Sequence, residues 1–199
     1  VTDASGKKEK LTVDELKTAL DVNTFYPGIT INGTDVSGKT KEQVQAMFAA
    51  DPSLDAPSVS LSLSVQGTAY PIDAASLHIT SNLAAVIDEA YNYGRTSAAA
   101  TEAEALVERY NTVALLAATP KAYTSSYTAD PIAISSVVHA ILDPLQKAPV
   151  NAKASSFDKD ALEFVVEESP QGLTLDADKA IADIQAAVNA QSLNQVIEV

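Results

Sequence analysis

The sequence predicts an α+β fold, in which two similar small modules of antiparallel or mixed sheet are packed with helices. Two kinds of pattern support this prediction. Several predicted helices begin at capping residues placed before apolar residues at helical spacing, and residues 59–65 alternate strictly between apolar and polar side chains. The 199 residues suffice to bury one large or two small cores.

Two helices in the first part of the chain are predicted from capping boxes. Thr12 is followed three residues later by Glu15, and Thr40 is followed three residues later by Gln43. In this pattern the two side chains each accept a hydrogen bond from the other residue's backbone amide, which satisfies donors at the helix start. We therefore expect helices to begin directly after Thr12 and Thr40.

Strands are predicted between and after these helices. Ile29–Ile31 is a β-branched run, and the dipeptide Asn32-Gly33 after it is a strong turn signal. Val59–Val65 predicts a strand with one buried and one wet face, which Gly67 turns back into a hairpin. Pro71 lacks an amide donor, so its strand is expected at an edge or end.

The middle of the chain predicts a helix, a segment with two interpretations, a buried strand and an extended segment. Leu83–Tyr93 has apolar residues at helical spacing, and Gly94 stands where a left-handed cap residue belongs. Residues 97–110 fit either a linker or the start of a helix. Val113–Ala117 predicts a buried strand, followed by an extended segment at Tyr123–Thr128.

The last third predicts two further helices and two strands. Asp130-Pro131 and Asp176 begin the helices as capping residues. Residues 162–166 and 196–199 are apolar enough for strands, and the turn at residues 169–172 ends in Gly172. The segment from Gly172 onward repeats the order seen from Gly33 onward, namely a glycine turn, a short extended link and a capped helix.

This repetition predicts the domain organisation. Residues 1–22 are expected to form an N-terminal linker with a short helix. Residues 23–110 and 111–199 are expected to form the first and second α+β modules. The alternative that the modules form one continuous domain stays open.

The charge and the composition exclude several classes of function. A net charge of −13 disfavours nucleic acids, anionic lipids and teichoic acids as ligands, since all of them are polyanions. The chain has no cysteine, which excludes thiol catalysis, disulfides and cysteine-ligated metals. It also has no apolar run of eighteen residues and no signal peptide. A suitable partner is neutral, cationic or bound through uncharged groups, such as a glycan or a stem peptide with free amines.

The stretch from Gly33 to Thr40 fits the phosphate-binding pattern G-x-x-x-x-G-K-T. The residues that would bind a nucleotide are Gly33, Gly38, Lys39 and Thr40. However, Asp35 would repel a polyphosphate, and the β-branched Val36 resists the backbone angles that such loops need. The same residues also serve as a turn followed by a helix cap, and we favour this interpretation.

Other chemistry has weaker support in the sequence. His78 and His139 have no partners at metal-ligand spacing, so we predict no metal and no cofactor. Ser156 to Lys159 fits S-x-x-K, but the motifs that accompany it in penicillin-binding enzymes are missing. The adjacent carboxylates Glu167 and Glu168 would point to opposite faces of a strand. We therefore predict no catalytic residue and no enzyme activity.

Five segments carry a resemblance to a known family: Phe25–Gln43, Tyr70–Leu77, Ile87–Arg95, Pro149–Ala152 and Gln171–Asp176. Together they resemble the peptidoglycan-binding region found before L,D-transpeptidase and vancomycin-resistance W-type domains in Gram-positive envelope proteins. The resemblance implies an extracellular, wall-associated module. Those transpeptidases use a cysteine, so their activity is not expected in this chain.

Candidate ligand-binding residues are side chains that can stack on a sugar or bind a carboxylate: Tyr26, Tyr91, Tyr93, Arg95, Tyr123 and Tyr127. For the tyrosines the preferred alternative is structural, with Tyr91 in the core and the others half-buried. Arg95 also has an alternative structural role, in which it pairs with Asp73 or Asp88, and this alternative is preferred. A second set is expected to form turns and helix caps: Gly33, Gly38, Thr40, Gly94, Asp130, Gly172 and Asp176.

These observations lead to one principal hypothesis and two alternatives. The principal one is a non-catalytic module that binds peptidoglycan or spaces another domain within the cell wall. On this interpretation a membrane anchor precedes the chain, and a catalytic domain is linked to it. The alternatives are a nucleotide-binding protein that uses Gly33–Thr40, and a structural or protein-interaction module with no wall ligand.

Overall fold

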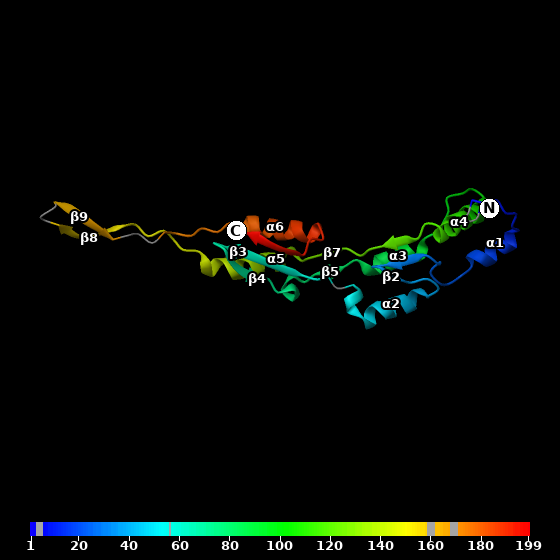
Figure 1. Cartoon of the computed structure of the whole chain (residues 1–199), viewed down its shortest axis with the longest axis horizontal. Coiled ribbons are helices and arrows are strands. Elements are labelled where there is room, and N and C mark those ends of the chain that lie inside the picture. Colours follow the sequence, from blue (N-terminus) through cyan, green and yellow to red (C-terminus); the bar gives the residue numbers. More distant parts are fainter. Residues whose placement is uncertain (3–5, 56, 159–161, 168–170) are drawn as a thin grey trace. The chain divides into compact units, whose positions relative to one another are not determined.

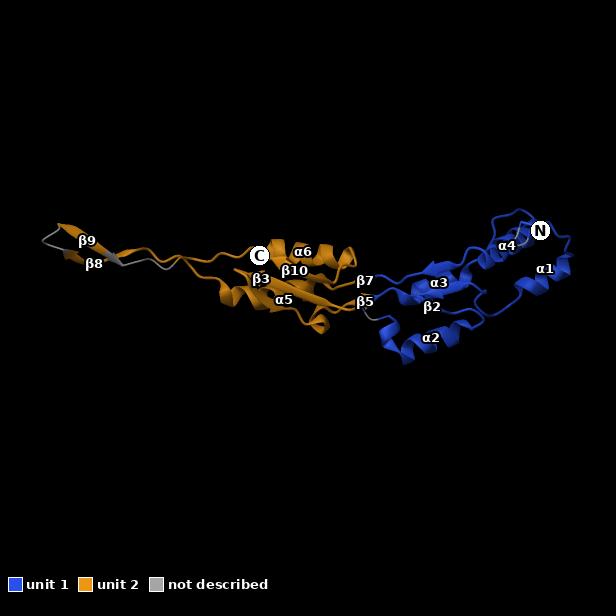
Figure 2. Cartoon of the chain, viewed as in Figure 1, with its two compact units in different colours: residues 1–57, 81–127 blue, residues 58–80, 128–199 orange. Residues whose placement is uncertain are grey.

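The computed structural model describes residues 1–2, 6–55, 57–158, 162–167 and 171–199 (Figure 1). Helices and short strands follow one another along the chain, which confirms the α+β fold. The contacts divide the chain into two compact units (Figure 2). Unit 1 comprises residues 1–57 and 81–127, and unit 2 comprises residues 58–80 and 128–199.

The two units interleave in the sequence. Each unit takes a segment from both halves of the chain, whereas the modules expected from the sequence meet between residues 110 and 111. Strand pairing explains this difference. In unit 1, Ile29–Ile31 pairs with Lys121–Tyr123, and in unit 2, Ser60–Val65 pairs with Asn194–Glu198, so each sheet needs residues from both halves.

Unit 1 contains four α-helices, three strands and two 3-10 turns among the described residues. They are α1 (Val13–Leu20), β1 (Ile29–Ile31), β2 (Thr34–Asp35), α2 (Lys41–Ala50), η1 (Pro52–Leu54), α3 (Leu83–Asn92), α4 (Glu102–Ala114), η3 (Leu115–Ala117) and β6 (Lys121–Tyr123). The sheet order is β2-β1-β6, with β1 antiparallel to β2 and parallel to β6.

The core of unit 1 is formed by apolar side chains from its helices and its sheet. Its buried members include Leu16 and Leu20 from α1, Ile29 and Ile31 from β1, Val44 and Phe48 from α2, Val86 and Ile87 from α3, and Leu106 from α4. These are the apolar positions that helical or strand periodicity brings to one face of each element. Burial of this shared face holds the unit together.

Unit 2 is built on a second three-stranded sheet. Its elements are β3 (Ser60–Val65), β4 (Thr68–Pro71), η2 (Ala74–Leu77), α5 (Pro131–Leu142), η4 (Asp143–Leu145), β8 (Lys153–Asp158), β9 (Glu163–Glu167), α6 (Ala177–Asn189) and β10 (Asn194–Glu198). The sheet order is β10-β3-β4, and β8 pairs with β9 as a separate antiparallel hairpin. Two short strands, β5 (Thr80–Ser81) and β7 (Tyr127–Thr128), pair where the sequence passes from one unit to the other.

The core of unit 2 lies between this sheet and two helices. Buried residues are supplied by β3 (Leu61, Leu63), α5 (Ile134, Val138, Leu142) and α6 (Ile184, Val188). Pro71 is the last residue of the edge strand β4, where its missing amide leaves no gap in the ladder. Ser64 departs from the expected alternation of β3, because it is buried together with its apolar neighbours.

The local signals for caps and turns correspond closely to the structure. Thr40 accepts a hydrogen bond from the Gln43 amide while the Gln43 side chain accepts one from the Thr40 amide. Asp130 accepts from the amide of Ile132 at the start of α5. Asn32 and Gly33 both have positive φ, the geometry of a tight hairpin turn between β1 and β2.

Crowding leaves no room for a side chain at several glycines, among them Gly94 and Gly172. A Cβ atom on Gly94 would lie 2.6 Å from a methyl group of Val113, and one on Gly172 would lie 2.8 Å from the backbone nitrogen of Pro149. Both distances are too short for a real contact. Side chains at these positions would therefore displace α4 or the segment around Pro149.

Several local predictions were wrong or incomplete. Val113–Ala117 is not a strand, because Val113 and Ala114 end α4 and Leu115–Ala117 form η3. Of the alternatives for residues 97–110, the helix is correct from Glu102 onward. The strand β8 was not expected, since its sequence is mostly small and polar. In the predicted turn at 169–172, residues 169 and 170 lie outside the described residues.

Candidate functional site

Arg95 lies among aromatic rings and backbone carbonyl groups of unit 1. Its Nε, Nη1 and Nη2 donate hydrogen bonds of 2.7, 2.7 and 2.6 Å to the carbonyl oxygens of Tyr91, Val22 and Thr24. The guanidinium carbon lies 4.7 Å from the ring centroid of Tyr26 and 4.2 Å from that of Tyr91. Arg95 therefore ties the end of α3 to the segment that leads into β1.

The structural role of Arg95 uses acceptors other than those expected. Asp88 pairs with Lys41 at 2.7 Å, and Asp73 belongs to unit 2, where it accepts the Ala75 amide at the start of η2. Arg95 bonds backbone carbonyls instead. A ligand carboxylate at this position would compete with three hydrogen bonds that already hold the guanidinium.

Lys121 lies near the rings of Tyr93 and Tyr123 in unit 1. The Nζ of Lys121 is 5.6 Å from the ring centroid of Tyr93 and 5.7 Å from that of Tyr123. Burial raises the pKa of Tyr123 to about 12, and the nearby charge of Glu89 adds to the shift. Tyr123 is only 8% exposed, so little of its ring can reach a ligand.

The structure thus brings most of the candidate binding residues together but covers their rings. Tyr26 is buried, and its hydroxyl donates to the carbonyl of Leu20 at 3.0 Å. Tyr91 and Tyr93 are half-buried, and Tyr127 is half-buried in β7.

The loop from Gly33 to Thr40 directs most of its amides into the protein. The amides of residues 36 to 40 all donate internally, to the carbonyls of Ile29, Phe25 and Val36 and to the side chains of Asp35 and Gln43. A phosphate-binding loop instead needs several amides that converge on an empty space. These five amides are already engaged in the turn.

Asp35 strengthens this conclusion. Hydrogen bonds from the hydroxyl and the amide of Ser37 lower the pKa of Asp35, so its carboxylate stays ionised inside the loop. A polyphosphate would face this fixed negative charge. The geometry therefore favours the turn and the helix cap, and it disfavours nucleotide binding at Gly33, Gly38, Lys39 and Thr40.

A cavity of about 440 Å³ lies between α1 and α4. Its lining residues are Lys17, Leu20, Asp21, Arg95, Glu102, Ala105, Leu106 and Arg109. Lys17 pairs with Glu102 at 2.7 Å; this hydrogen bond raises the pKa of Lys17 and lowers that of Glu102. Arg109 donates from Nε to the carbonyl of Gly94 at 3.1 Å. Three basic side chains thus meet two acidic ones in a chain that is otherwise strongly acidic.

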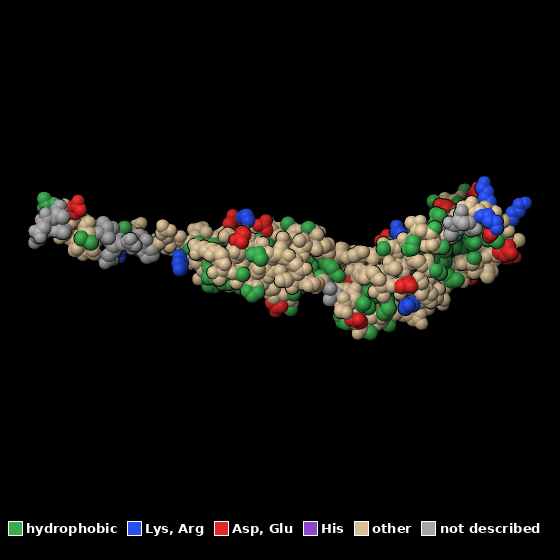
Figure 3. Space-filling model, in the orientation of Figure 1, with side chains coloured by type: hydrophobic (Ala, Val, Ile, Leu, Met, Phe, Trp, Pro, Cys, Tyr) green, Lys and Arg blue, Asp and Glu red, His purple; other side chains and the backbone are tan. Residues whose placement is uncertain are grey.

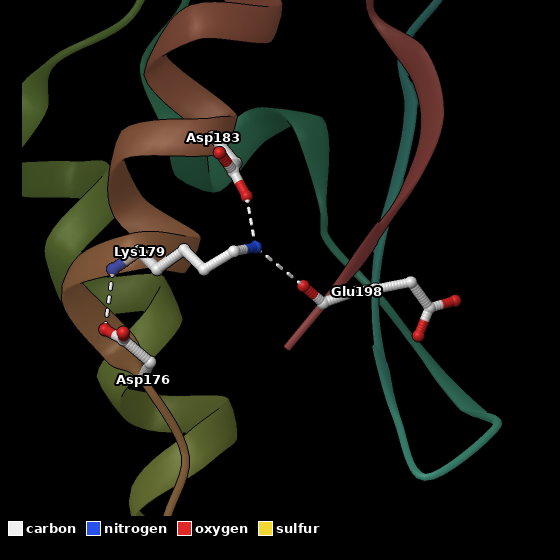
Figure 4. A network of polar contacts seen from close by, with 4 residues as sticks. All are labelled: Asp176, Lys179, Asp183 and Glu198. Atoms are coloured by element: carbon white, nitrogen blue, oxygen red, sulfur yellow. Dashed lines mark hydrogen bonds and ion pairs between the residues drawn. The ribbon is translucent and has the colours of Figure 1, made fainter.

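In unit 2 a polar network joins α6 to β10 (Figure 4). Asp176 accepts from the amide of Lys179 at 2.9 Å and so caps α6. The Nζ of Lys179 donates to Asp183 at 2.8 Å and to the carbonyl oxygen of Glu198 at 3.2 Å. The bond to Asp183 raises the pKa of Lys179. These contacts stabilise the packing of the helix on the edge strand.

The two histidines lie at the ends of helical segments. His78 adopts a left-handed backbone conformation at the end of η2, and His139 contacts Asp143 at 3.1 Å within one turn of helix. Among the described residues, no group of three or more acidic or histidine side chains is arranged to hold a metal ion. Ser156 lies in β8, and Lys159 lies outside the described residues.

The sequence interpretation missed the aromatic side chains that are exposed. Phe157 and Phe164 lie opposite each other in the β8–β9 hairpin, with 45% and 68% of their surfaces exposed. The run 162–166 predicts the strand that contains Phe164, but the mostly small and polar residues around Phe157 give no strand signal. Without β8, the cross-strand pair of Phe157 and Phe164 could not be predicted.

The helices, the short sheets and the cavity together define an α+β protein. Residues 70–196 match the family described as "Putative peptidoglycan binding domain". The match covers more than half of the chain, so the chain belongs to this family. It includes every resembling segment from Tyr70 onward, whereas Phe25–Gln43 precedes it. No curated protein and no solved structure matches the chain.

Proposed function

We propose that this chain is a non-catalytic module that binds peptidoglycan outside the cell. The single observation that carries this proposal is the family match across residues 70–196, which includes parts of both units. The charge of −13 is compatible with a largely uncharged polymer and unfavourable for polyanions of the envelope. Among the described residues, no helix is long and apolar enough to cross a bilayer.

The cavity between α1 and α4 is our candidate contact for a stem peptide. Arg109 lines it and uses its Nε within the protein, which leaves the terminal nitrogens of the guanidinium for a carboxylate that enters the cavity. In this proposal Arg109, and not Arg95, binds the carboxylate of the stem peptide, because the guanidinium of Arg95 already donates to three carbonyl groups. The tyrosines near Arg95 would shape the surroundings of this contact.

The wider architecture is part of the same proposal. We place the chain in a Gram-positive envelope protein, where it binds the wall or spaces a linked catalytic domain from a membrane anchor. The resemblance to regions that precede L,D-transpeptidase and vancomycin-resistance W-type domains supports this arrangement. No cofactor is needed for either role.

Co-sedimentation with purified, teichoic-acid-free peptidoglycan tests the proposal. We expect retention at low salt, with no new muropeptides or reducing ends released during the incubation. Arg109→Ala should weaken retention. The matched control is Lys121→Ala, which removes one positive charge from β6, outside the residues that line the cavity, and should leave retention unchanged. Absence of retention would leave only the spacer role, and release of fragments would contradict the non-catalytic assignment.

A further inference from the structure

Exposed aromatic rings are confined to one place in this protein. The chain has four phenylalanines and seven tyrosines, all among the described residues, and only Phe157 and Phe164 are exposed. They are direct cross-strand partners in the β8–β9 hairpin. Their ring centroids are 5.0 Å apart, with an angle of 61° between the planes.

The exposed pair belongs to a hairpin with further accessible apolar side chains. Leu162, directly before β9, and Val165 within it are both exposed. A two-stranded hairpin is marginally stable by itself in water, and exposed apolar groups rimmed by polar residues mark interaction surfaces. The register shifts between Ala154 and Ser156, a bulge of the kind that re-aims neighbouring side chains.

The charges around the pair favour an uncharged ligand. Of the charged strand residues whose side chains the structure describes, Lys153 lies in β8 and Glu163 in β9, so the two charges balance. Acidic side chains are scattered over the visible face of the molecule in Figure 3, in agreement with its net charge of −13. This charge opposes adsorption to an anionic membrane, so an apolar patch on this chain suits a neutral partner.

A pyranose ring has the required chemistry. One face of the sugar presents C–H groups, which are attracted to the negative face of an aromatic ring, while its hydroxyl groups stay at the rim in water. We propose that Phe157 and Phe164 form an aromatic platform that stacks against sugar rings of the peptidoglycan glycan strand. This inference rests on the proposed function and names the part of the polymer that unit 2 contacts.

The test uses the full chain and a β-1,4-linked N-acetylglucosamine hexamer as the probe, with affinity measured by NMR titration. The double variant F157L/F164L keeps apolar side chains but removes the rings, and we expect about tenfold weaker binding. The variant F157Y/F164Y keeps the rings and should bind within about twofold of the wild type. Ile132→Ala, which removes another exposed apolar side chain of unit 2, is the matched control and should change nothing.

Folding of the hairpin is monitored in every variant through cross-strand amide contacts between Ser156 and Val165. Loss of hexamer binding in the leucine variant, with the hairpin intact and the tyrosine variant active, supports the platform. Equal binding by the leucine and tyrosine variants overturns it. So does an undetectable hexamer interaction in a chain that still sediments with peptidoglycan, and in that case the proposed function stands.

Three other results would also overturn the platform. If the chain fails to sediment with peptidoglycan, the proposed binding to the wall falls together with the platform. Concentration-dependent dimerisation that F157L/F164L abolishes would show that the rings pair with a second copy. Binding to neutral lipid vesicles that the same variant abolishes would show that the hairpin inserts into a bilayer interface.

Discussion

At the scale of single residues, Arg95 shows how a side chain that suggests ligand binding serves the fold. Its planar guanidinium donates to three carbonyls and lies on two aromatic rings. Lysine has neither the planar shape nor the number of fixed donors needed for this arrangement. The Gly94-Arg95 dipeptide therefore positions α3 against the segment before β1.

We expect Arg95→Ala to lower the free energy of unfolding by roughly 2–4 kcal/mol, because it removes charge-assisted hydrogen bonds and cation–π contacts together. Arg95→Lys should recover only part of this loss. Arg109→Ala, which removes one hydrogen bond, is the matched control and should cost about 1 kcal/mol or less. Denaturant unfolding measures all three. An Arg95→Ala protein of unchanged stability that no longer binds peptidoglycan would assign Arg95 to the ligand instead.

Tyr123 gives a prediction for pH. Its pKa is raised to about 12 in the folded state, mainly by burial, whereas an unfolded tyrosine titrates near 10. The unfolded state therefore loses its proton first, so Tyr123 stabilises the fold fully below about pH 10 and this contribution is lost as the pH rises toward 12. Absorbance titration near 295 nm should show one late tyrosine that disappears in Tyr123→Phe. A titration curve without this late transition would contradict the assignment.

At the scale of elements, the helix caps were the part of the fold that could be predicted most closely. A cap depends on residues within one turn of each other, so Thr40 with Gln43 and Asp130 with Pro131 carry their structural meaning in the sequence itself. The strand β8 could not be predicted in this way. Its small and polar residues acquire a strand conformation from pairing with β9.

The cap at Asp176 provides a quantitative test. Asp176→Ala should destabilise unit 2 by about 1 kcal/mol, because the Lys179 amide at the start of α6 loses its acceptor. Asp176→Asn keeps a side-chain oxygen at the same position and should lose much less. Thermal or denaturant unfolding distinguishes the two variants. Equal loss in both would show that the negative charge matters more than the hydrogen bond.

The turn that imitates a nucleotide-binding loop can be tested in the same way. Lys39→Ala should leave both stability and ligand binding nearly unchanged, since the amides of residues 36 to 40 are engaged within the protein. Calorimetry with Mg-ATP should give no binding heat for either protein. A saturable signal that Lys39→Ala abolishes would restore the nucleotide-binding alternative.

At the scale of the whole molecule, local sequence patterns do not specify the division into units. The sheets are completed by strands that enter late in the sequence, β6 in unit 1 and β10 in unit 2. Such pairings depend on residues far apart in the chain, and single-sequence patterns do not specify them. The α+β class followed from the elements, whereas their assembly followed from long-range pairing.

The same reasoning explains the candidate site. Tyrosines and an arginine could be selected by type, but their burial depends on which helix covers them. The position of Arg109 depends on the packing of α1 against α4, which forms the cavity. The exposure of Phe157 and Phe164 depends on the β8–β9 hairpin. Residue chemistry was therefore predictable, whereas the cavity beside Arg109 and the exposure of the two phenylalanine rings depend on tertiary structure.

Interleaved units lead to a prediction about fragments. A chain cut between residues 110 and 111 separates β1 from β6 and β3 from β10. We expect neither fragment to unfold cooperatively by itself, while a mixture of the two should recover helical structure. Circular dichroism during heating measures this. A cooperative transition in either isolated fragment would show that the modules 23–110 and 111–199 fold independently.

Binding of this chain to peptidoglycan is tested most directly by NMR of the ¹⁵N-labelled protein during titration with soluble fragments of teichoic-acid-free peptidoglycan. We predict saturable shifts of amide signals in the β8–β9 hairpin and along the cavity between α1 and α4, with the amides of residues 36 to 40 unchanged. A spectrum without any saturable shift would contradict a peptidoglycan-binding function for this chain.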